Sequence, residues 1–402
     1  MAYDVTAVRA QFPALDEGAA HFDGPGGSQT PAVVADAVAD TLRSAVANKG
    51  TVTAAERRAT DIVDAARTAG ADLLGVAADG IVFGRSMTQL TYDFARTLAK
   101  NWGPGDEIVV TRLDHDANVR PWVQAADAVG ATVHWADFDP ATGILGAEDV
   151  AKVLSPRTRL VAVTAASNLL GSRPPVAAIA ATAHQVGALV YVDGVHLTPH
   201  VFVDAAGLGA DFYACSPYKF LGPHLGMLAA EPALLEQLRP DKLAPASDVV
   251  PERFEYGTLP YEALAGTTAA IDFLAGLAPG AGSRRARLAG AFEVLEQHES
   301  VLLSQLDSGL AEIAGVRRYG APDRRRTPTT LFSVTGVAPG AVYRGLAERG
   351  VNAPAGTFYA YECARRLDLG DGGAVRAGIA PYTTKSDVDR LLEGVAALAG
   401  RR

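Results

Sequence analysis

The sequence predicts an α/β fold in which a mostly parallel sheet carries helices on both faces and a smaller α/β domain follows. Two observations lead to this class. Short apolar runs rich in β-branched residues alternate with helical patterns through the first two-thirds of the 402 residues. These runs are almost continuously apolar, which is typical of parallel strands buried on both faces, whereas a strand with one wet face alternates apolar and polar residues.

Each expected element of the large sheet has its own signal. A helix is expected at residues 88–100, where Leu90, Phe94 and Leu98 repeat every four positions, and another at residues 176–186. The strands are expected at residues 81–83, 108–111, 132–135, 160–164, 189–192 and 227–229, with a further strand-like run before Lys219. Ligands of such sheets bind beyond the carboxyl ends of the strands, so functional residues are expected in the loops that follow them.

A second domain is expected after residues 277–283, where Gly, Pro and Ala gather as in a linker. A long helical pattern follows at 287–313, then a strand at 330–334, a helix at 341–349, a strand at 374–377 and a last helix. Thr384 and Asp387 have the spacing of a capping box at the start of that last helix. The predicted large domain therefore covers residues 16–279 and the small α/β domain residues 280–402, with residues 1–15 packing on the small domain.

Composition and charge exclude several classes of function. The net charge is −9, and the only short basic run, Arg324 to Arg326, is expected on a solvated loop, so no nucleic acid partner is expected. No stretch reaches the ~18 apolar residues of a membrane span and no signal-peptide pattern is present, so no membrane association is expected. The two cysteines, Cys215 and Cys363, fit neither a disulfide framework nor a zinc site, which predicts a cytoplasmic location.

Lys219 and Asp193 form the most informative pair in the chain. Lys219 follows a strand-like run and enters a Gly/Pro turn, with Ser216 three residues before it, while Asp193 ends the apolar run 189–192. Pyridoxal 5'-phosphate chemistry needs such an amine, which forms a Schiff base, and such a carboxylate, which keeps the pyridine nitrogen protonated. Each residue alone reads as an ordinary surface lysine or strand-ending aspartate, whereas the pair predicts a pyridoxal phosphate enzyme.

A phosphate site is expected where residues 83–91 change from a strand through a tight turn into a helix. The backbone N–H groups of Ser86, Met87 and Thr88 would point out of that helix N-terminus, where the helix dipole attracts an anion. The same residues also read as a plain helix start with a capping side chain. Neither a Walker loop nor a dinucleotide-binding glycine pattern is present.

Other polar residues follow strand ends. His115 is expected to stack on the cofactor ring and Asn118 to reach the substrate, although His115 alone reads as a loop histidine. Asn168 could hold the phenolic oxygen of the cofactor or the substrate carboxylate, or simply form a turn. His196 could hydrogen-bond the same oxygen. No metal site is expected from His196 and His200, because Pro199 breaks any helix between them.

These motifs together resemble the class V aminotransferase family of fold-type-I pyridoxal phosphate enzymes, in its cysteine desulfurase and selenocysteine lyase branch. The resemblance covers nearly the whole chain. It is carried, in order, by Phe22-Asp23, Asp114-His115-x-Ala117-Asn118-x-x-Pro121-Trp122, Ser167-Asn168-x-x-Gly171, Val192-Asp193-Gly194, Ser216-x-x-Lys219, Phe254-Glu255-x-Gly257-Thr258 and Val375-Arg376-Ala377-Gly378. Any one block is weak, whereas seven in the right order are specific.

The resemblance implies a seven-stranded sheet, a homodimer with shared active sites and a role for each matching residue. Lys219 would be the Schiff-base lysine, Asp193 the pyridinium partner and His115 the stacking ring. Ser86, Met87, Thr88, Ser216 and the hydroxyl of Tyr218 would hold the cofactor phosphate. Thr258 would reach the phosphate of the other subunit, and Arg376 would bind the α-carboxylate of an amino-acid substrate through a bidentate pair.

Two departures from the family matter. Tyr218 stands beside Lys219 where many relatives have His, and its hydroxyl can still bind a phosphate. Cysteine desulfurases carry a nucleophilic cysteine on a mobile loop, and Tyr359 occupies that position here. Cys363 falls in a helical pattern and Cys215 at a strand end, and both are expected to be structural rather than reactive.

We therefore expect a pyridoxal phosphate enzyme that acts on an L-amino acid by desulfurase-like or C–S lyase chemistry without the usual loop cysteine. An aminotransferase or amino-acid epimerase of the same family is the first alternative, and a non-catalytic binding protein of the same fold is the second. The pocket walls are expected near residues 24–29, Tyr256 and residues 358–361. Their aromatic character indicates a substrate bulkier than free cysteine.

Overall fold

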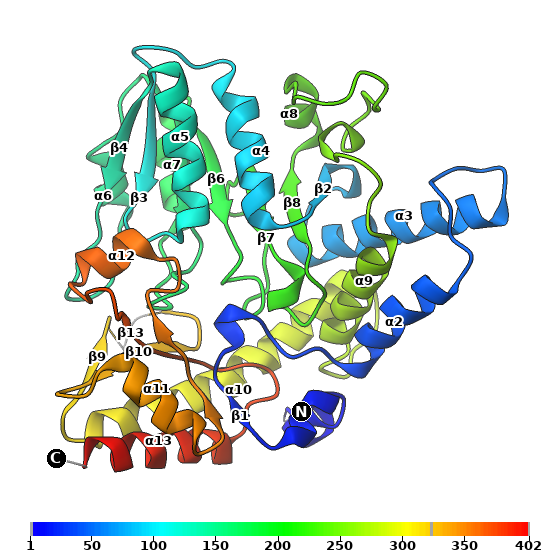
Figure 1. Cartoon of the computed structure of the whole chain (residues 1–402). Coiled ribbons are helices and arrows are strands. Elements are labelled where there is room, and N and C mark those ends of the chain that lie inside the picture. Colours follow the sequence, from blue (N-terminus) through cyan, green and yellow to red (C-terminus); the bar gives the residue numbers. More distant parts are fainter. Residues whose placement is uncertain (1–2, 322–324, 401–402) are drawn as a thin grey trace.

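The computed structural model describes residues 3–321 and 325–400, and it consists of two stacked units (Figure 1). The upper unit is built around a seven-stranded sheet and the lower one around a four-stranded sheet. The carboxyl ends of the parallel strands point toward the lower unit (Figure 1). The loops that the sequence marks as functional therefore lie between the two sheets.

The large sheet has the strand order β2-β8-β7-β6-β5-β3-β4. The five strands β3 to β7 are mutually parallel, while β8 runs antiparallel to both β2 and β7. Their bounds are β2 Ile81–Gly84, β3 Glu107–Thr111, β4 Thr132–Ala136, β5 Thr158–Thr164, β6 Leu189–Asp193, β7 Phe212–Cys215 and β8 Gly226–Ala230. The prediction of a mostly parallel seven-stranded sheet is confirmed.

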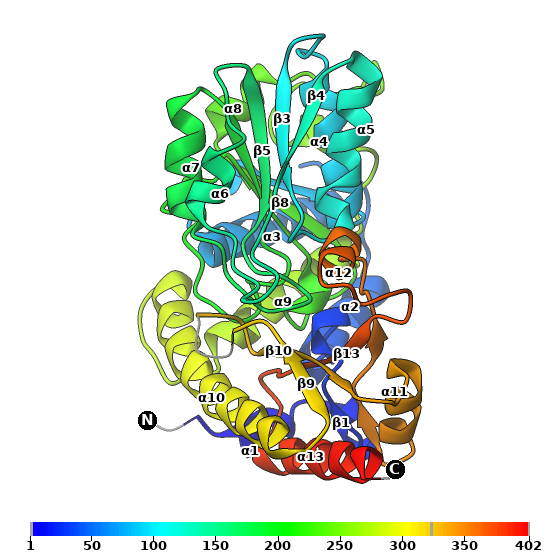
Figure 2. The ribbon, with the colours of Figure 1, turned by 90° about the vertical axis from the view of Figure 1, so that its left-hand side faces the viewer.

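Helices cover both faces of this sheet (Figure 2). Leu90, Phe94 and Trp122 pack one face together with inward residues of the strands, and Val63 and Ile179 belong to the core on the other face. The helices of this unit are α2 Ala32–Arg43, α3 Ala54–Leu74, α4 Met87–Ala99, α5 Arg120–Val129, α6 Ala147–Ala151, α7 Val176–Gln185, α8 Pro232–Gln237 and α9 Tyr261–Ala275. Both faces are dry, which explains why the strands read as continuous apolar runs.

The lower unit holds an antiparallel sheet of order β12-β13-β10-β9. Its strands are β9 Val316–Tyr319, β10 Thr329–Val334, β12 Ala355–Gly356 and β13 Ala374–Gly378, and its helices are α10 Arg284–Glu312, α11 Pro339–Ala347, α12 Tyr361–Arg366 and α13 Lys385–Ala399. Thr384 and Asp387 form the expected capping box of α13. The predicted boundary at residues 279/280 falls between α9 and α10 and stays a prediction.

The N-terminal segment joins the lower unit over a longer stretch than residues 1–15. Helix α1 Val5–Arg9 is tied to it by the ion pair of Arg9 with Asp387 at 3.0 Å. Strand β1 Ala20–His21 pairs in parallel with β11 Val351–Asn352, and Asp23 forms a bridge with Gly378. Residues 20–23, which the sequence placed in the large domain, therefore pair with the small unit, because a two-residue strand has too little pattern of its own.

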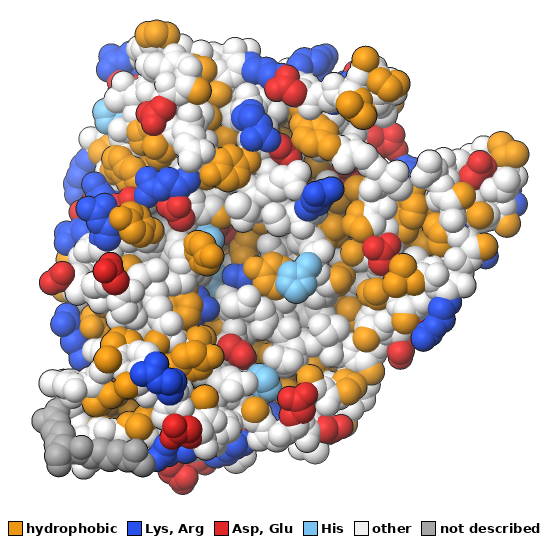
Figure 3. All heavy atoms as spheres, viewed as in Figure 1, with side chains coloured by type: hydrophobic (Ala, Val, Ile, Leu, Met, Phe, Trp, Pro, Cys, Tyr) orange, Lys and Arg blue, Asp and Glu red, His pale blue; other side chains and the backbone are white. Residues whose placement is uncertain are grey.

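The surface carries acidic and basic side chains of both signs, interspersed on the face shown in Figure 3. Of the expected solvated basic run, Arg324 lies outside the described residues. Arg326 contradicts the expectation, since its side chain is only 6% exposed and pairs with Asp307. Within the described ranges, no helix is both long and apolar enough to cross a bilayer.

Candidate active site

Two adjoining cavities lie at the carboxyl ends of β5, β6 and β7. The inner cavity has a volume of about 50 Å³ and the outer one about 480 Å³. Both are lined by Thr88, His115, Ala117, Asn168, Tyr218 and Lys219. The inner cavity adds, among others, Met87, Asp193, His196 and Ser216, and the outer one adds Pro25, Tyr92, Arg120, Phe358, Tyr359 and Arg376. The structure thus brings most of the residues that the sequence singled out to one place.

Lys219 lies at the floor of both cavities. It ends the 3₁₀ turn Pro217–Lys219 that follows β7, and its Nζ donates a hydrogen bond of 2.8 Å to the carbonyl oxygen of Pro25. Burial and the positive charge of Arg376 lower the pKa of Lys219 to about 8, while Asp193 opposes the shift. A substantial fraction of this amine is therefore neutral near pH 7.5, which is the form that attacks a carbonyl.

Asp193 is the last residue of β6, and the parallel register sets it between Thr164 of β5 and Ala214 of β7. Its Oδ1 accepts a hydrogen bond of 2.9 Å from the backbone N–H of Val195. Burial raises the pKa of Asp193 to about 6, and the hydrogen bond and the charge of Lys219 counteract part of that shift. The group is therefore an anion at neutral pH, enclosed in the inner cavity.

His115 stands on the loop after β3 as a neutral ring. Burial and the charges of Lys219 and Arg376 lower its pKa to about 3. Its Nδ1 accepts a hydrogen bond of 3.0 Å from the N–H of Ala117, which leaves the proton on Nε2. The imidazole stacks on the ring of Tyr359 with 5.6 Å between centroids. A flat, uncharged surface is thus presented to the cavity.

The N-terminus of α4 borders the cavity through Met87 and Thr88. Ser86 is its N-cap, and its Oγ accepts a hydrogen bond of 3.1 Å from the N–H of Gln89. The hydroxyl is therefore used inside the helix start, and Ser86 is not among the lining residues. Gly226 of β8 lies so close that a Cβ there would approach the Ser86 carbonyl oxygen to 2.5 Å, so only glycine fits beneath this turn.

Arg376 of β13 reaches across from the small unit. Its Nη1 donates to the carbonyl oxygen of Asn168 at 2.9 Å, and its guanidinium lies 3.8 Å from the centre of the Phe358 ring. Burial lowers the pKa of Arg376 to about 9, so the group still carries a charge at neutral pH. A buried cation without an ionic partner in the described chain is a suitable anchor for a carboxylate.

Three buried polar atoms at this place have no hydrogen-bond partner among the described residues. They are Asn168 Oδ1, His196 Nδ1 and Arg376 Nε. The other nitrogen of His196 lies 3.1 Å from the hydroxyl of Thr329, and the Nδ2 of Asn168 donates to the carbonyl of Phe358. Buried polar groups are normally paired, so these atoms indicate that the cavity is built for a polar ligand.

Besides Ser86, two residues predicted for the site line neither cavity. Asn118 is fully buried, donates to Asp114 at 2.6 Å and accepts from Trp122 at 3.1 Å, and it lines neither cavity. The amide therefore serves the packing of its own loop, and a contact of Asn118 with substrate stays a prediction that these cavities do not support. Thr258 is exposed on the surface and lines neither cavity.

Several contacts of the site residues were not predicted from the sequence. The carbonyl of Pro25, within the expected wall 24–29, accepts a hydrogen bond from the Lys219 amine, and a backbone acceptor has no sequence signal. Asp114, which precedes His115 in its motif, had no assigned role; it is buried, and burial raises its pKa to about 8. Phe358, within the expected wall 358–361, contacts Arg376 only because the tertiary fold brings the two segments together.

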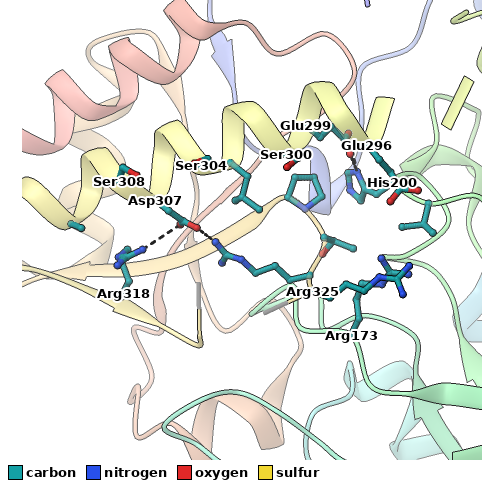
Figure 4. Close-up of a pocket in the computed structure, with 16 residues that line it drawn as sticks. Arg173, His200, Glu296, Glu299, Ser300, Ser304, Asp307, Ser308, Arg318 and Arg325 are labelled. Carbon is teal, nitrogen blue, oxygen red and sulfur yellow. Dashed lines mark hydrogen bonds and ion pairs between the residues drawn. The ribbon is translucent and has the colours of Figure 1, made fainter. Parts of the chain in front are cut away.

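A further cavity of about 610 Å³ lies elsewhere, along α10 (Figure 4). Its ionisable side chains include Asp307, which pairs with Arg326, and Glu299, which pairs with His200 at 3.0 Å. Lys219 and Asp193 do not line it. Lys219 lines both of the smaller adjoining cavities, with Asp193 on the inner one and Arg376 on the outer one.

Comparison with known proteins agrees with this geometry. The family model described as aminotransferase class V matches residues 20–391. An uncharacterized protein of Mycobacterium tuberculosis is 35% identical over 99% of this chain and 100% of its own length. A probable cysteine desulfurase of Halalkalibacterium halodurans is 32% identical over 96% of both chains.

A solved structure is similar over the same extent. The crystal structure of the cysteine desulfurase CsdA from Escherichia coli superposes with a TM-score of 0.86 at 29% identity, covering 99% of this chain and 98% of its own. These matches confirm the resemblance deduced from the sequence, the fold class and the assignment as an enzyme. They also confirm pyridoxal 5'-phosphate as the cofactor.

Proposed function

We propose that this chain, which belongs to the class V aminotransferase family, is a C–S lyase acting on an L-amino acid with a sulfur-bearing side chain. The observation that carries the proposal is the meeting of Lys219, Asp193 and Arg376 on two adjoining cavities. Neither cysteine, both of which lie in the described part of the chain, lines these cavities.

The residues present fit pyridoxal phosphate. Asp193 lies where a carboxylate can hold a proton on the pyridine nitrogen, and His115 offers a flat neutral ring to stack against. The unpaired Nδ1 of His196 can donate to the phenolic oxygen, and the unpaired Oδ1 of Asn168 can accept from it when it carries a proton. The N–H groups of Met87 and Thr88, with Ser216 and Tyr218, suit the phosphate.

The protein side chains then divide the work. When bound, pyridoxal phosphate supplies an electron sink for negative charge at the substrate's α carbon. Arg376 binds the α-carboxylate and so orients the amino acid, and Lys219 takes the proton from the α carbon and can give it to the departing sulfur. Cleavage converts a cysteine conjugate and water into pyruvate, ammonia and a free thiol, without an external oxidant or reductant.

The state of the two thiols supports a lyase rather than a sulfur carrier. Cys215 and Cys363 are fully buried, and burial raises the pKa of both thiols far above neutrality. A persulfide carrier needs an accessible thiolate. Buried, unbridged thiols also support the predicted cytoplasmic location.

We further propose a homodimer with shared active sites. Helices α2 and α3 form a projecting arm (Figure 1). The exposed hydrophobic residues Val33 and Leu42 lie on α2, and Val52, which is 83% exposed, lies between α2 and α3. A second copy of the chain would cover this surface. Thr258, which is also exposed, would then reach the neighbouring subunit's phosphate site.

The test is to incubate the purified holoenzyme with L-cysteine and with S-benzyl-L-cysteine and to identify the products by mass. Pyruvate with sulfide or benzyl thiol supports the lyase. Alanine with sulfide would instead indicate a desulfurase, a sulfur-containing 2-oxo acid an aminotransferase, and the D-enantiomer an epimerase.

The Lys219→Ala variant is expected to lose turnover by about 10³-fold, because it removes both the covalent anchor and the acid/base. The visible absorption of the cofactor attached to the protein should be lost with it. Lys242→Ala, which changes a lysine that pairs with Asp248 outside both cavities, serves as the matched control. Unchanged cofactor absorption and turnover in Lys219→Ala would contradict the proposal.

A further inference from the structure

The segment between β12 and α12 holds two aromatic residues in an unusual backbone conformation. Phe358 and Tyr359 have φ values of 52° and 57°, in the left-handed region. Bulky side chains rarely adopt this region, and such residues persist where the surrounding structure enforces them. The conformation therefore indicates that the direction of these two rings matters.

The segment is held to the large unit from both sides. The carbonyl of Phe358 accepts from Asn168 Nδ2 at 2.9 Å, and the carbonyl of Tyr359 accepts from the N–H of Asp116 at 2.7 Å. Directly afterwards, buried Glu362 pairs with Arg120 at 2.6 Å and with Arg112 at 3.3 Å. These hydrogen bonds and ion pairs hold the segment in place, so it forms a fixed wall.

The wall presents aromatic surface to the outer cavity. The ring of Tyr359 stacks on His115, yet its side chain is 76% exposed, and Tyr92 lines the same cavity. Tyr359 also lines an outer hollow of about 280 Å³ together with Tyr361. A substituent that passes Tyr359 would therefore find further aromatic surface.

The charges around Tyr359 are already paired. Arg120 is a cation at the rim of the cavity, and it forms ion pairs with Asp116 at 2.9 Å and with Glu362 at 2.6 Å. Arg376, the other arginine that lines this cavity, is the anchor for the α-carboxylate, so the substrate side chain beyond it meets aromatic rings and paired charges. Such a surface favours apolar groups, because they gain by leaving water and lose no hydration of charge.

We propose that Phe358 and Tyr359 form a fixed specificity wall that selects L-cysteine S-conjugates with an aromatic or large apolar group on the sulfur. The inference rests on the proposed lyase function and adds the substrate class. Phe358 acts through Arg376, on which it stacks, whereas Tyr359 contacts the substituent itself. Free cysteine and short S-alkyl derivatives leave the wall uncovered.

The experiment measures binding with carbon analogues, in which a methylene replaces the sulfur so that no C–S bond can break. L-norvaline stands for S-methylcysteine, and L-2-amino-5-phenylpentanoate stands for S-benzylcysteine. Isothermal titration of the holoenzyme should show the phenyl compound binding about tenfold more tightly or better, as expected for one aromatic contact plus the buried ring.

The variant Tyr359→Asn tests the wall, because Asn tolerates the left-handed conformation while the aromatic ring is removed. It should lose most of the preference for the phenyl compound and keep the affinity for L-norvaline. Tyr359→Phe should keep the preference, and so should Tyr343→Ala, which removes a tyrosine that is 39% exposed on α11 outside the cavities.

The outcomes separate this inference from the proposed function. Equal affinities for the two analogues, or an unchanged preference in Tyr359→Asn, would overturn the specificity wall. Tighter binding of the phenyl analogue that is lost in Tyr359→Asn would uphold the wall. If S-benzyl-L-cysteine then released no thiol, the lyase would be overturned while the wall stood. If neither analogue binds, the specificity wall is overturned, and the lyase is judged only by the release of thiol from S-benzyl-L-cysteine.

Discussion

At the scale of single residues, the amine of Lys219 makes cofactor attachment depend on pH. Only the neutral amine attacks an aldehyde, and the pKa of Lys219 is lowered to about 8. The rate at which the apoprotein captures pyridoxal phosphate should rise by about tenfold from pH 7 to pH 9 and then level off. Stopped-flow absorption of the attached cofactor measures this rate.

The control is an N-acetylated lysine in solution under the same conditions. Its amine has the ordinary pKa of about 10.4, so its rate should keep rising beyond pH 9, and this comparison also removes changes in the cofactor's own ionisation. If the rate of the protein kept rising beyond pH 9 in parallel with that of the free amine, burial would not lower the pKa of Lys219.

Residue identities at this site were predictable where the chemistry demands a particular side chain. Lys219, Asp193 and Arg376 carry charge at strand ends or on an apolar strand, and such placements stand out in a sequence. Asn118 was misleading, because an amide that packs against Asp114 and a tryptophan looks the same in the sequence as one that faces a ligand. Contacts through backbone atoms, such as the Pro25 carbonyl, cannot be seen in side-chain patterns.

At the scale of elements, the loop that carries Thr258 depends on one buried ion pair. Glu255 accepts hydrogen bonds from Nη1 and Nη2 of Arg67, at 2.8 and 2.7 Å, and from the N–H of Phe83 at 2.9 Å. Glu255→Ala leaves the Arg67 charge buried and unpaired, which should lower the free energy of unfolding by about 3 kcal/mol. Urea titration followed by circular dichroism measures the loss.

The matched control is Glu252→Ala, three residues earlier on the same segment. Its partner Lys49 and the glutamate itself are 31% and 40% exposed, so the change should cost less than about 1 kcal/mol. Equal losses of unfolding free energy in the two variants would show that the buried Arg67–Glu255 pair stabilises the fold no more than the exposed Lys49–Glu252 pair. Retention of the cofactor by Glu255→Ala should also fall, because Thr258 follows Glu255 in the same turn.

Elements were predictable where burial leaves a periodic signal. The strands of the large sheet and the helices α4, α7 and α10 follow from apolar runs and repeats, since both faces of that sheet are dry. Strand β9 reads Val-Arg-Arg-Tyr and lies at the edge of the small sheet, so its pattern is polar. The two-residue strands β1, β11 and β12 exist only because tertiary structure brings their partners beside them.

At the scale of the whole molecule, active sites shared between two subunits predict that two defective subunits can complement each other in a mixed dimer. If Thr258 serves the neighbouring subunit, Thr258→Ala should weaken cofactor binding by about tenfold through the loss of one hydrogen bond to phosphate. Lys219→Ala should abolish attachment within its own subunit. A mixed dimer of the two variants then contains one site with both defects and one site with none.

Co-expression with two different tags and tandem purification would isolate this mixed dimer. Its one site that keeps Lys219 should attach the cofactor, measured after borohydride reduction, to about half of the wild-type amount and with the wild-type affinity, because one of two equivalent sites is intact. The Thr258→Ala dimer should need about tenfold more cofactor, and the Lys219→Ala dimer should attach none. If Thr258 acts within its own subunit, the site that keeps Lys219 lacks Thr258, and its affinity for the cofactor stays about tenfold weaker. Wild-type affinity in the mixed dimer thus requires the dimer and assigns Thr258 to the neighbour's site in one measurement.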